Sequence, residues 1–137
     1  MKCIKCGNCC KFTQMQLTND DIRKIKKLGF KEDQFIKIDK YGFAKLKNRN
    51  GYCVFYDTVK KECKIYENRP KGCILYPIIY DPIKKDVIID SFCPSADTIT
   101  EEELKSKRVI LMKTIKQLYK EARKRSYIYK NKKIKNL

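Results

Sequence analysis

The sequence predicts an α+β fold: a small, cysteine-rich domain with short β-hairpins and a long amphipathic helix at its C-terminal end. Eight of the 137 residues are cysteines, and four of these fall within the first ten positions. The middle of the chain alternates short apolar runs with turn-forming residues, as hairpins do. From Thr100 onward the apolar residues recur at helical spacing instead. At this length we expect one domain over residues 1–125, followed by a basic, flexible tail over residues 126–137.

The first element after the N-terminal cysteines is a short helix predicted by the stretch LTNDDIRKIKKLGF. Thr18 suits the N-cap position with Asp21 three residues later, and Gly29 is a natural stop. The apolar edge of this helix comprises Ile22, Ile25 and Leu28. The following stretch, KEDQFIKI, is expected to add a further helical turn.

Two hairpins are predicted in the middle of the chain. Residues 42–57 contain two short strands around the turn-forming residues 48–51. Residues 74–90 contain two apolar runs on either side of the turn residues 81–86.

The last predicted element is a long helix. Thr100 and Glu103 fit a capping box at its start. One face of this helix carries Leu104, Leu111, Ile115, Leu118 and Ala122. We expect it to extend for about five or six turns.

The absence of histidine limits the chemistry that the cysteines can support. Without imidazole, a soft-metal site must use thiolates alone, or thiolates with carboxylate, backbone or external ligands. A four-thiolate zinc site and an iron–sulfur cluster both meet this condition. We see no secretory signal before Cys3 and no apolar stretch near the ~20 residues that span a membrane. We therefore expect a soluble, cytoplasmic protein without membrane contacts, where clustered cysteines bind metal more often than they form disulfides.

The spacing Cys3-x-x-Cys6-x-x-Cys9 allows successive thiolates to converge on one point. Each pair of intervening residues can form a tight turn whose backbone amides are directed at the sulfurs, and Gly7 eases the required dihedral angles. Ferredoxin-like loops use this spacing for three ligands to a cubane cluster, with a remote Cys-Pro as the fourth. Cys93-Pro94 is such a remote candidate, and a tetrahedral zinc site could use the same atoms.

Cys10 does not fit this scheme directly, because adjacent side chains diverge in most backbone conformations. Cys10 is therefore expected to face a different site or to stay near the first site as a non-ligand. Four thiols remain for a second centre: Cys10, Cys53, Cys63 and Cys73. One metal centre with spare cysteines, two centres, and disulfides or buried free thiols are the alternatives. The candidate metal ligands are Cys3, Cys6, Cys9, Cys10, Cys53, Cys63, Cys73 and Cys93.

Several of these motifs together resemble the YkgJ-type cysteine-cluster family, described as a zinc- or iron-chelating domain. The resemblance rests on C-x-x-C-G-x-C-C at residues 3–10, TxxD at 18–21, Cys-x-Phe at 53–55, Cys-x-Ile-Tyr-x-x-Arg-Pro-x-x-Cys at 63–73 and Tyr-Pro at 76–77. It covers Cys3 to about Cys93 and implies a bound metal, with every cysteine except Cys93 matching the motif. Arg69 matches the Arg-Pro element and either compensates the charge of a thiolate centre or is a surface residue.

The resemblance does not carry an enzymatic activity to this chain. Some relatives, such as flagellin lysine methylases, contain a related cluster within an enzyme. Here no catalytic residues can be identified and no glycine-rich nucleotide loop is present, so we do not expect an enzyme on its own.

The sequence thus predicts a metal-binding protein that holds iron, as an iron–sulfur cluster of the 4Fe–4S type, or zinc. We expect it to act as an electron or cluster carrier, or as an accessory subunit of a larger enzyme, with an unknown protein partner. The alternative is a zinc-stabilised module whose basic C-terminal region contacts nucleic acid or an acidic partner. Residues 105–137 hold 13 Lys and Arg residues against one acidic residue, which is the basis for that alternative.

Overall fold

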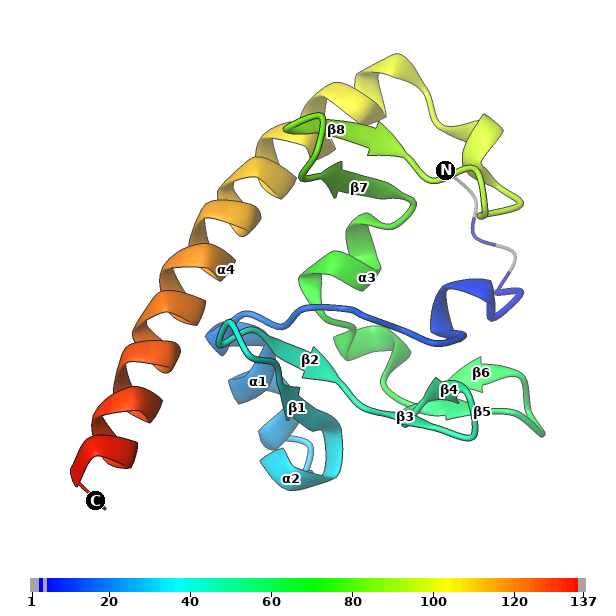
Figure 1. The fold of residues 1–137 in the computed structure, drawn as a ribbon. Helices are drawn as coiled ribbons and strands as arrows, with labels where there is room; N and C mark the ends of the chain where they lie inside the picture. The colour runs from blue at the N-terminus through cyan, green and yellow to red at the C-terminus, as the bar shows by residue number, and fades with distance from the viewer. Residues whose placement is uncertain (1–2, 4, 136–137) are drawn as a thin grey trace.

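The computed structural model describes residue 3 and residues 5–135. It is an α+β fold of short strand pairs beside one long helix, as predicted (Figure 1). The helices are α1 (Asn19–Lys26), α2 (Glu32–Phe35), α3 (Lys71–Leu75) and α4 (Glu101–Lys135), with single 3-10 turns at Asn8–Cys10, Tyr66–Asn68 and Ala96–Thr98. The strands are β1 (Ile36–Ile38), β2 (Ala44–Leu46), β3 (Asn48–Arg49), β4 (Tyr52–Cys53), β5 (Tyr56–Asp57), β6 (Glu62–Cys63), β7 (Ile78–Asp81) and β8 (Asp86–Ile89).

Helix α1 begins at the predicted cap. The Thr18 hydroxyl accepts from the Asp21 backbone N–H, and the Asp21 carboxylate accepts from the Thr18 N–H, each at 3.0 Å. Gly29 has a φ of 102°, which confirms its place just after the helix. Ile25 is fully buried, whereas Leu28 is 45% exposed because it lies beyond the last residue of α1.

The strands form four separate antiparallel pairs, β1–β2, β3–β4, β5–β6 and β7–β8. The predicted hairpin of residues 74–90 is confirmed, with Ile78 opposite Ile89. The predicted hairpin of residues 42–57 is confirmed around the Asn50-Gly51 turn, where both residues have positive φ, but its strands β3 and β4 have only two residues each. Strand β2 pairs instead with the preceding strand β1, because residues 39–43 form a tight turn closed by backbone hydrogen bonds.

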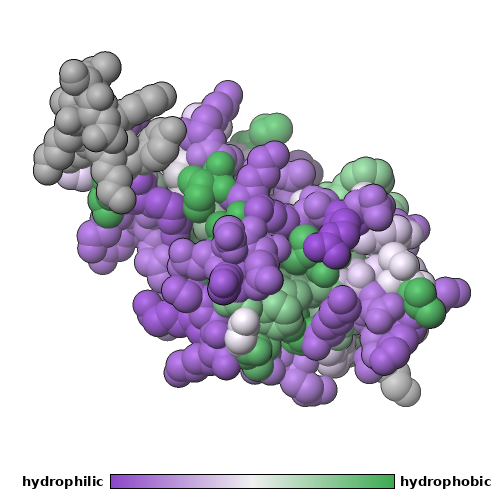
Figure 2. Space-filling model, turned by 90° about the horizontal axis from the view of Figure 1, so that it is seen from below, coloured by the Kyte–Doolittle hydropathy of each residue, from purple (hydrophilic) through white to green (hydrophobic). Residues whose placement is uncertain are grey.

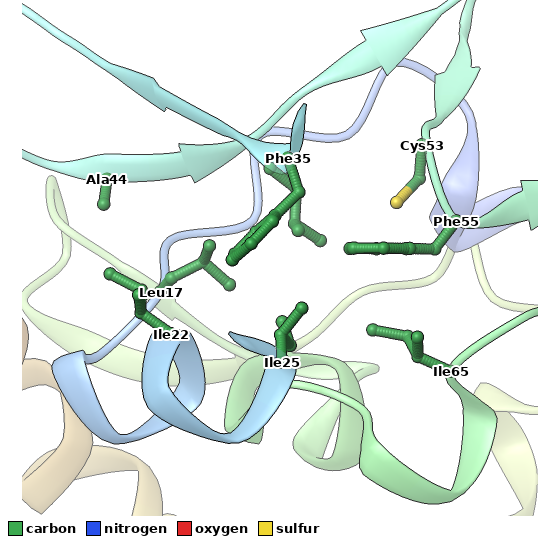
Figure 3. Packing of buried hydrophobic residues seen from close by; sticks show 9 residues of the cluster. Leu17, Ile22, Ile25, Phe35, Ala44, Cys53, Phe55 and Ile65 are labelled. Carbon is green, nitrogen blue, oxygen red and sulfur yellow. The ribbon is translucent and has the colours of Figure 1, made fainter. Parts of the chain in front are cut away.

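Two hydrophobic cores hold these pairs together. The first lies between α1, the β1–β2 pair and β4, where the rings of Phe35 and Phe55 and the side chain of Cys53 point into one space (Figure 3). The second joins α3 and the β7–β8 pair to α4 through Leu75, Ile78 and Leu111. Hydrophilic side chains cover most of the face drawn in Figure 2, around a hydrophobic area near its centre.

Helix α4 extends along the whole molecule (Figure 1). The Thr100 hydroxyl accepts from the Glu103 N–H at 3.1 Å, as the predicted cap requires. Leu111, Leu118 and Ala122 are buried on the predicted face. The helix is longer than expected, since helical backbone continues to Lys135 through most of the segment expected to be a tail. The division between domain and tail at residue 125 stays a prediction. Within the described residues, every helix is too short or too polar to cross a membrane.

Candidate metal centre

The N-terminal loop turns its backbone amides toward two cysteine sulfurs. The N–H of Lys5 donates to Cys3 Sγ, and the N–H of Asn8 donates to Cys6 Sγ, each at 3.4 Å. This confirms the amide direction that the Cys-x-x-Cys spacing predicts. Such N–H···S bonds stabilise thiolates and commonly surround the sulfur atoms that bind a metal.

Gly7 fixes the path of this loop. Its φ is 80°, in the left-handed region that glycine tolerates best. A Cβ at this position would lie 2.4 Å from the hydroxyl oxygen of Tyr56. The loop therefore packs directly on the Tyr56 side chain of β5, and any larger residue at position 7 would force the loop or this ring to move.

Six cysteines surround one cavity of about 270 Å³. They come from the N-terminal loop, β4, β6 and α3, and they are Cys3, Cys9, Cys10, Cys53, Cys63 and Cys73. The adjacent residues Cys9 and Cys10 line this same cavity. The cavity adjoins the first core, against which Cys10, Cys63 and Cys73 pack.

The remaining two cysteines, Cys6 and Cys93, do not line the cavity but lie near the N-terminal cysteines that do. The segment that follows β8 and the N-terminal loop that carries Cys6 and Cys9 lie at the same end of the molecule (Figure 1). Burial raises the pKa of Cys93, and the neighbouring Cys6, Cys3 and Cys9 raise it further. The fold thus brings the remote Cys-Pro element to the N-terminal cysteines.

The cavity thiols differ in acidity. A side-chain hydrogen bond from Cys10 lowers the pKa of Cys9 to about 7, although burial opposes this, and the same bond raises the pKa of Cys10. Burial raises the pKa of Cys53 to about 11 and also raises the pKa of Cys63 and Cys73. Neighbouring cysteines contribute to each of these increases, because a nearby thiolate disfavours the ionisation of another thiol.

Arg69 supplies positive charge at this cavity. Its guanidinium lies 4.0 Å from the ring centroid of Tyr66, and its Nε donates to the Tyr66 carbonyl at 2.9 Å. The Lys5 ammonium lies 4.4 Å from the centroid of the same ring. The charge of Arg69 helps to lower the pKa of Cys9. It also partly offsets the effect of burial, which raises the pKa of Cys63. This geometry favours the charge-compensating role over that of an ordinary surface arginine.

Two residues of α1 position the segment that carries Cys73. The Asp21 carboxylate accepts from the Lys71 N–H at 3.0 Å, at the first residue of α3. The Lys24 ammonium donates to the Arg69 carbonyl at 2.9 Å. The sequence identified Asp21 only as a local cap, because its second partner lies 50 positions further along the chain.

The donor set fits a thiophilic metal group. All eight cysteines are free thiols. Within the described residues six of them line the cavity, and no three Cys, Asp or Glu side chains meet at a single ion-binding point. Sulfur ligands, inward amide donors and a neighbouring cation are the features that zinc–thiolate and iron–sulfur sites share.

Fold and site define a small α+β protein with a cysteine-lined cavity. The CxxCxxCC family, described as "Putative zinc- or iron-chelating domain", matches residues 2–94, so the chain belongs to this family. "Uncharacterized protein MJ0661" of Methanocaldococcus jannaschii is 38% identical over 80 residues, which cover 55% of this chain and 43% of the relative. The match therefore spans less than half of that relative's length. No solved structure matches the chain.

Proposed function

We propose that the protein holds an iron–sulfur cluster in the cysteine cavity and acts as an electron or cluster carrier, or as an accessory subunit of a larger enzyme. The observation that carries this proposal is the cavity of about 270 Å³ lined by six cysteines. One water needs only about 10–15 Å³ of such space. A structural zinc ion is enclosed by its four ligands. The size of the cavity therefore favours a polynuclear group over a single zinc ion.

The chain's own residues would stabilise such a group in three ways. Four of the six cavity thiols would supply its ligands, with Cys6 and Cys93 beside them. Arg69 offsets the negative charge of the thiolates, and the first core shields the side of the cavity formed by Cys53 from water. When bound, an iron–sulfur cluster supplies one-electron redox chemistry, and its potential depends on these charges and hydrogen bonds.

The test is metal analysis of protein purified without oxygen. Iron and acid-labile sulfide, each at about four per chain, with visible thiolate-to-iron absorption are expected. Cys73→Ser should lose this absorption, whereas Val59→Ser, an 89% exposed position outside the cavity, should retain it. Zinc without sulfide would overturn the cluster proposal and leave the zinc module.

A second candidate function rests on the outward face of α4. This face carries five exposed cations, and no ion pair joins any of them to the residues that the structure describes. They are Lys113, Lys116, Lys120, Arg123 and Lys124. The apolar face of the helix is packed on the body, so it is not free to insert into a membrane surface. Evenly spaced cations on a long helix suit the phosphates of nucleic acid, and we propose this contact as the alternative role.

Salt dependence tests this alternative. A variant with glutamine at the five positions should bind duplex DNA more weakly and reduce the slope of log K against log salt by up to about 4.5, at ~0.9 per phosphate contact. A control with glutamine at the exposed Lys37, Lys84 and Lys85 should change the slope little. Equal slopes for the wild type and the five-site variant would exclude the α4 face as the contact.

A further inference from the structure

A second cavity, of about 460 Å³, adjoins the cysteine cavity. Its walls come from the N-terminal segment at residues 8–16, strand β7, residues 90 and 92 after β8, and α4. Small-molecule sites commonly enclose about 300–1,000 Å³ and are mostly apolar with a few polar groups. The volume of this cavity falls within that range.

The interior of the cavity is apolar, and aromatic rings surround its mouth. The aliphatic part of the lining includes Met15, Ile78, Leu111, Ile115 and Leu118. At the mouth, Phe12, Phe92 and Tyr119 are 75%, 59% and 45% exposed. A single exposed aromatic residue needs no explanation, but three around one cavity form a concave apolar surface of the kind that binds ligands.

Phe12 is held in an unusual conformation at this mouth. Its φ is 45°, in the left-handed region that bulky residues rarely adopt. Its N–H donates to the Gly51 carbonyl at 2.8 Å. A Cβ on Gly51 would lie 3.2 Å from the Phe12 ring, so this ring packs on a position without a side chain. Strained backbone of this kind is concentrated at functional sites.

The charged residues in the lining restrict the net charge that a ligand of this cavity can carry. Among the lining residues that the structure describes, Asp90 is the single carboxylate and Lys11 the single cation. Asp90 is already occupied, because it accepts from the Tyr76 hydroxyl at 2.7 Å and from the Phe92 N–H at 3.0 Å. The other polar groups are neutral amides and hydroxyls, together with the Cys9 thiol at the wall shared with the cysteine cavity. The lining thus lacks the grouped cations that phosphate or carboxylate ligands require.

We propose that this second cavity binds an uncharged, largely apolar small molecule with an aromatic ring. Cys9, Thr13 and Met15 line both cavities, so the bound molecule contacts the wall beside the cysteine thiols. Binding at this site requires no metal. Failure of the iron–sulfur proposal would therefore leave this one intact.

The experiment is a fluorescence titration of the purified protein with 1-aminoanthracene, an uncharged aromatic dye whose emission increases in apolar surroundings. We expect saturable binding of one dye per chain. Phe12→Gly removes the ring but suits the φ of 45°. This variant should keep or raise the Tm while weakening dye binding at least tenfold. Lys85→Gly is the matched control, because Lys85 has a φ of 52° and is exposed outside the cavity.

A second pair of variants tests the interior. Ile115→Trp fills the cavity and should abolish dye binding, whereas Val109→Trp, at a 57% exposed position on the same helix, should not change it. The proposal is overturned if the dye binds without saturation, or if Phe12→Gly and Ile115→Trp both leave the affinity unchanged. Light scattering tests a further outcome. If the protein is a dimer that binds the dye only after dilution to the monomer, a second copy of the chain occupies the cavity and the proposal is overturned.

Discussion

Replacing Asp21 with asparagine tests how the fold holds the helix that carries a cavity cysteine. The Asp21 side chain is buried, and each of its carboxylate oxygens accepts one backbone N–H. Oδ2 accepts from Thr18 at the start of α1, and Oδ1 accepts from Lys71 at the start of α3. Asparagine has nearly the same shape but one acceptor oxygen, so it can satisfy only one of these donors and directs its NH₂ group at the other.

The expected loss follows from these two bonds. A hydrogen bond to a charged group contributes about 1.5–3 kcal/mol, and an unsatisfied buried donor costs a similar amount. Asp21→Asn should therefore lower the free energy of unfolding by about 3 kcal/mol and the Tm by about 10 °C. Thr18→Ala removes only the hydroxyl that accepts from the Asp21 N–H, and it should lower the free energy of unfolding by about 1 kcal/mol. A larger loss for Asp21→Asn than for Thr18→Ala would show that Asp21 stabilises more than the local cap.

Urea denaturation followed by circular dichroism, at fixed metal content, provides both values. Asp20→Asn is the control, because Asp20 is exposed in the same helical turn. Asp21→Asn should also reduce the metal bound per chain, since α3 carries Cys73. A loss below about 1 kcal/mol for Asp21→Asn would refute this reasoning, because the donor that asparagine cannot satisfy would then be satisfied by water.

Three further predictions concern single positions. Gly42→Ala should lower the free energy of unfolding by about 3 kcal/mol, because its Cβ would lie 2.3 Å from the Ala122 carbonyl of α4. Gly29→Ala is the control for the same urea assay. Gly29 is also at positive φ but has no atom within 4 Å of the added Cβ, so the loss should be only about 1 kcal/mol. Gly7→Ala should release most of the bound metal, because the added Cβ would prevent the N-terminal loop from packing on β5. Elemental analysis measures this loss, and an unchanged metal content would contradict the role of the loop. Burial raises the pKa of Asp39, but two backbone N–H donors and a lysine outweigh this, so its net pKa is lowered. Asp39 thus stabilises the fold above its ordinary pKa near 4, and this stabilisation disappears as pH falls through the lower folded value. Asp39→Asn should therefore flatten the decrease in Tm below about pH 4, and an unchanged acid profile would contradict the assignment.

Local features of the fold were predictable from the sequence. The cap at Thr18, the stop at Gly29 and the cap at Thr100 were all predicted correctly. Each depends on hydrogen bonds or dihedral angles within about four residues, which the local sequence encodes directly. The hairpin of residues 74–90 was predictable for the same reason, since its two strands are joined by a short turn.

Tertiary packing decided the rest. Strand β2 could pair with the segment before it or after it, and the turn at residues 39–43 selected β1. The cysteine spacing predicted the N-terminal loop and its amide donors. It could not predict that Cys53, Cys63 and Cys73 line a cavity with that loop, or that Asp21 holds α3. These groups lie tens of residues apart, and only the hydrophobic cores, which bury side chains from distant segments together, bring them into contact.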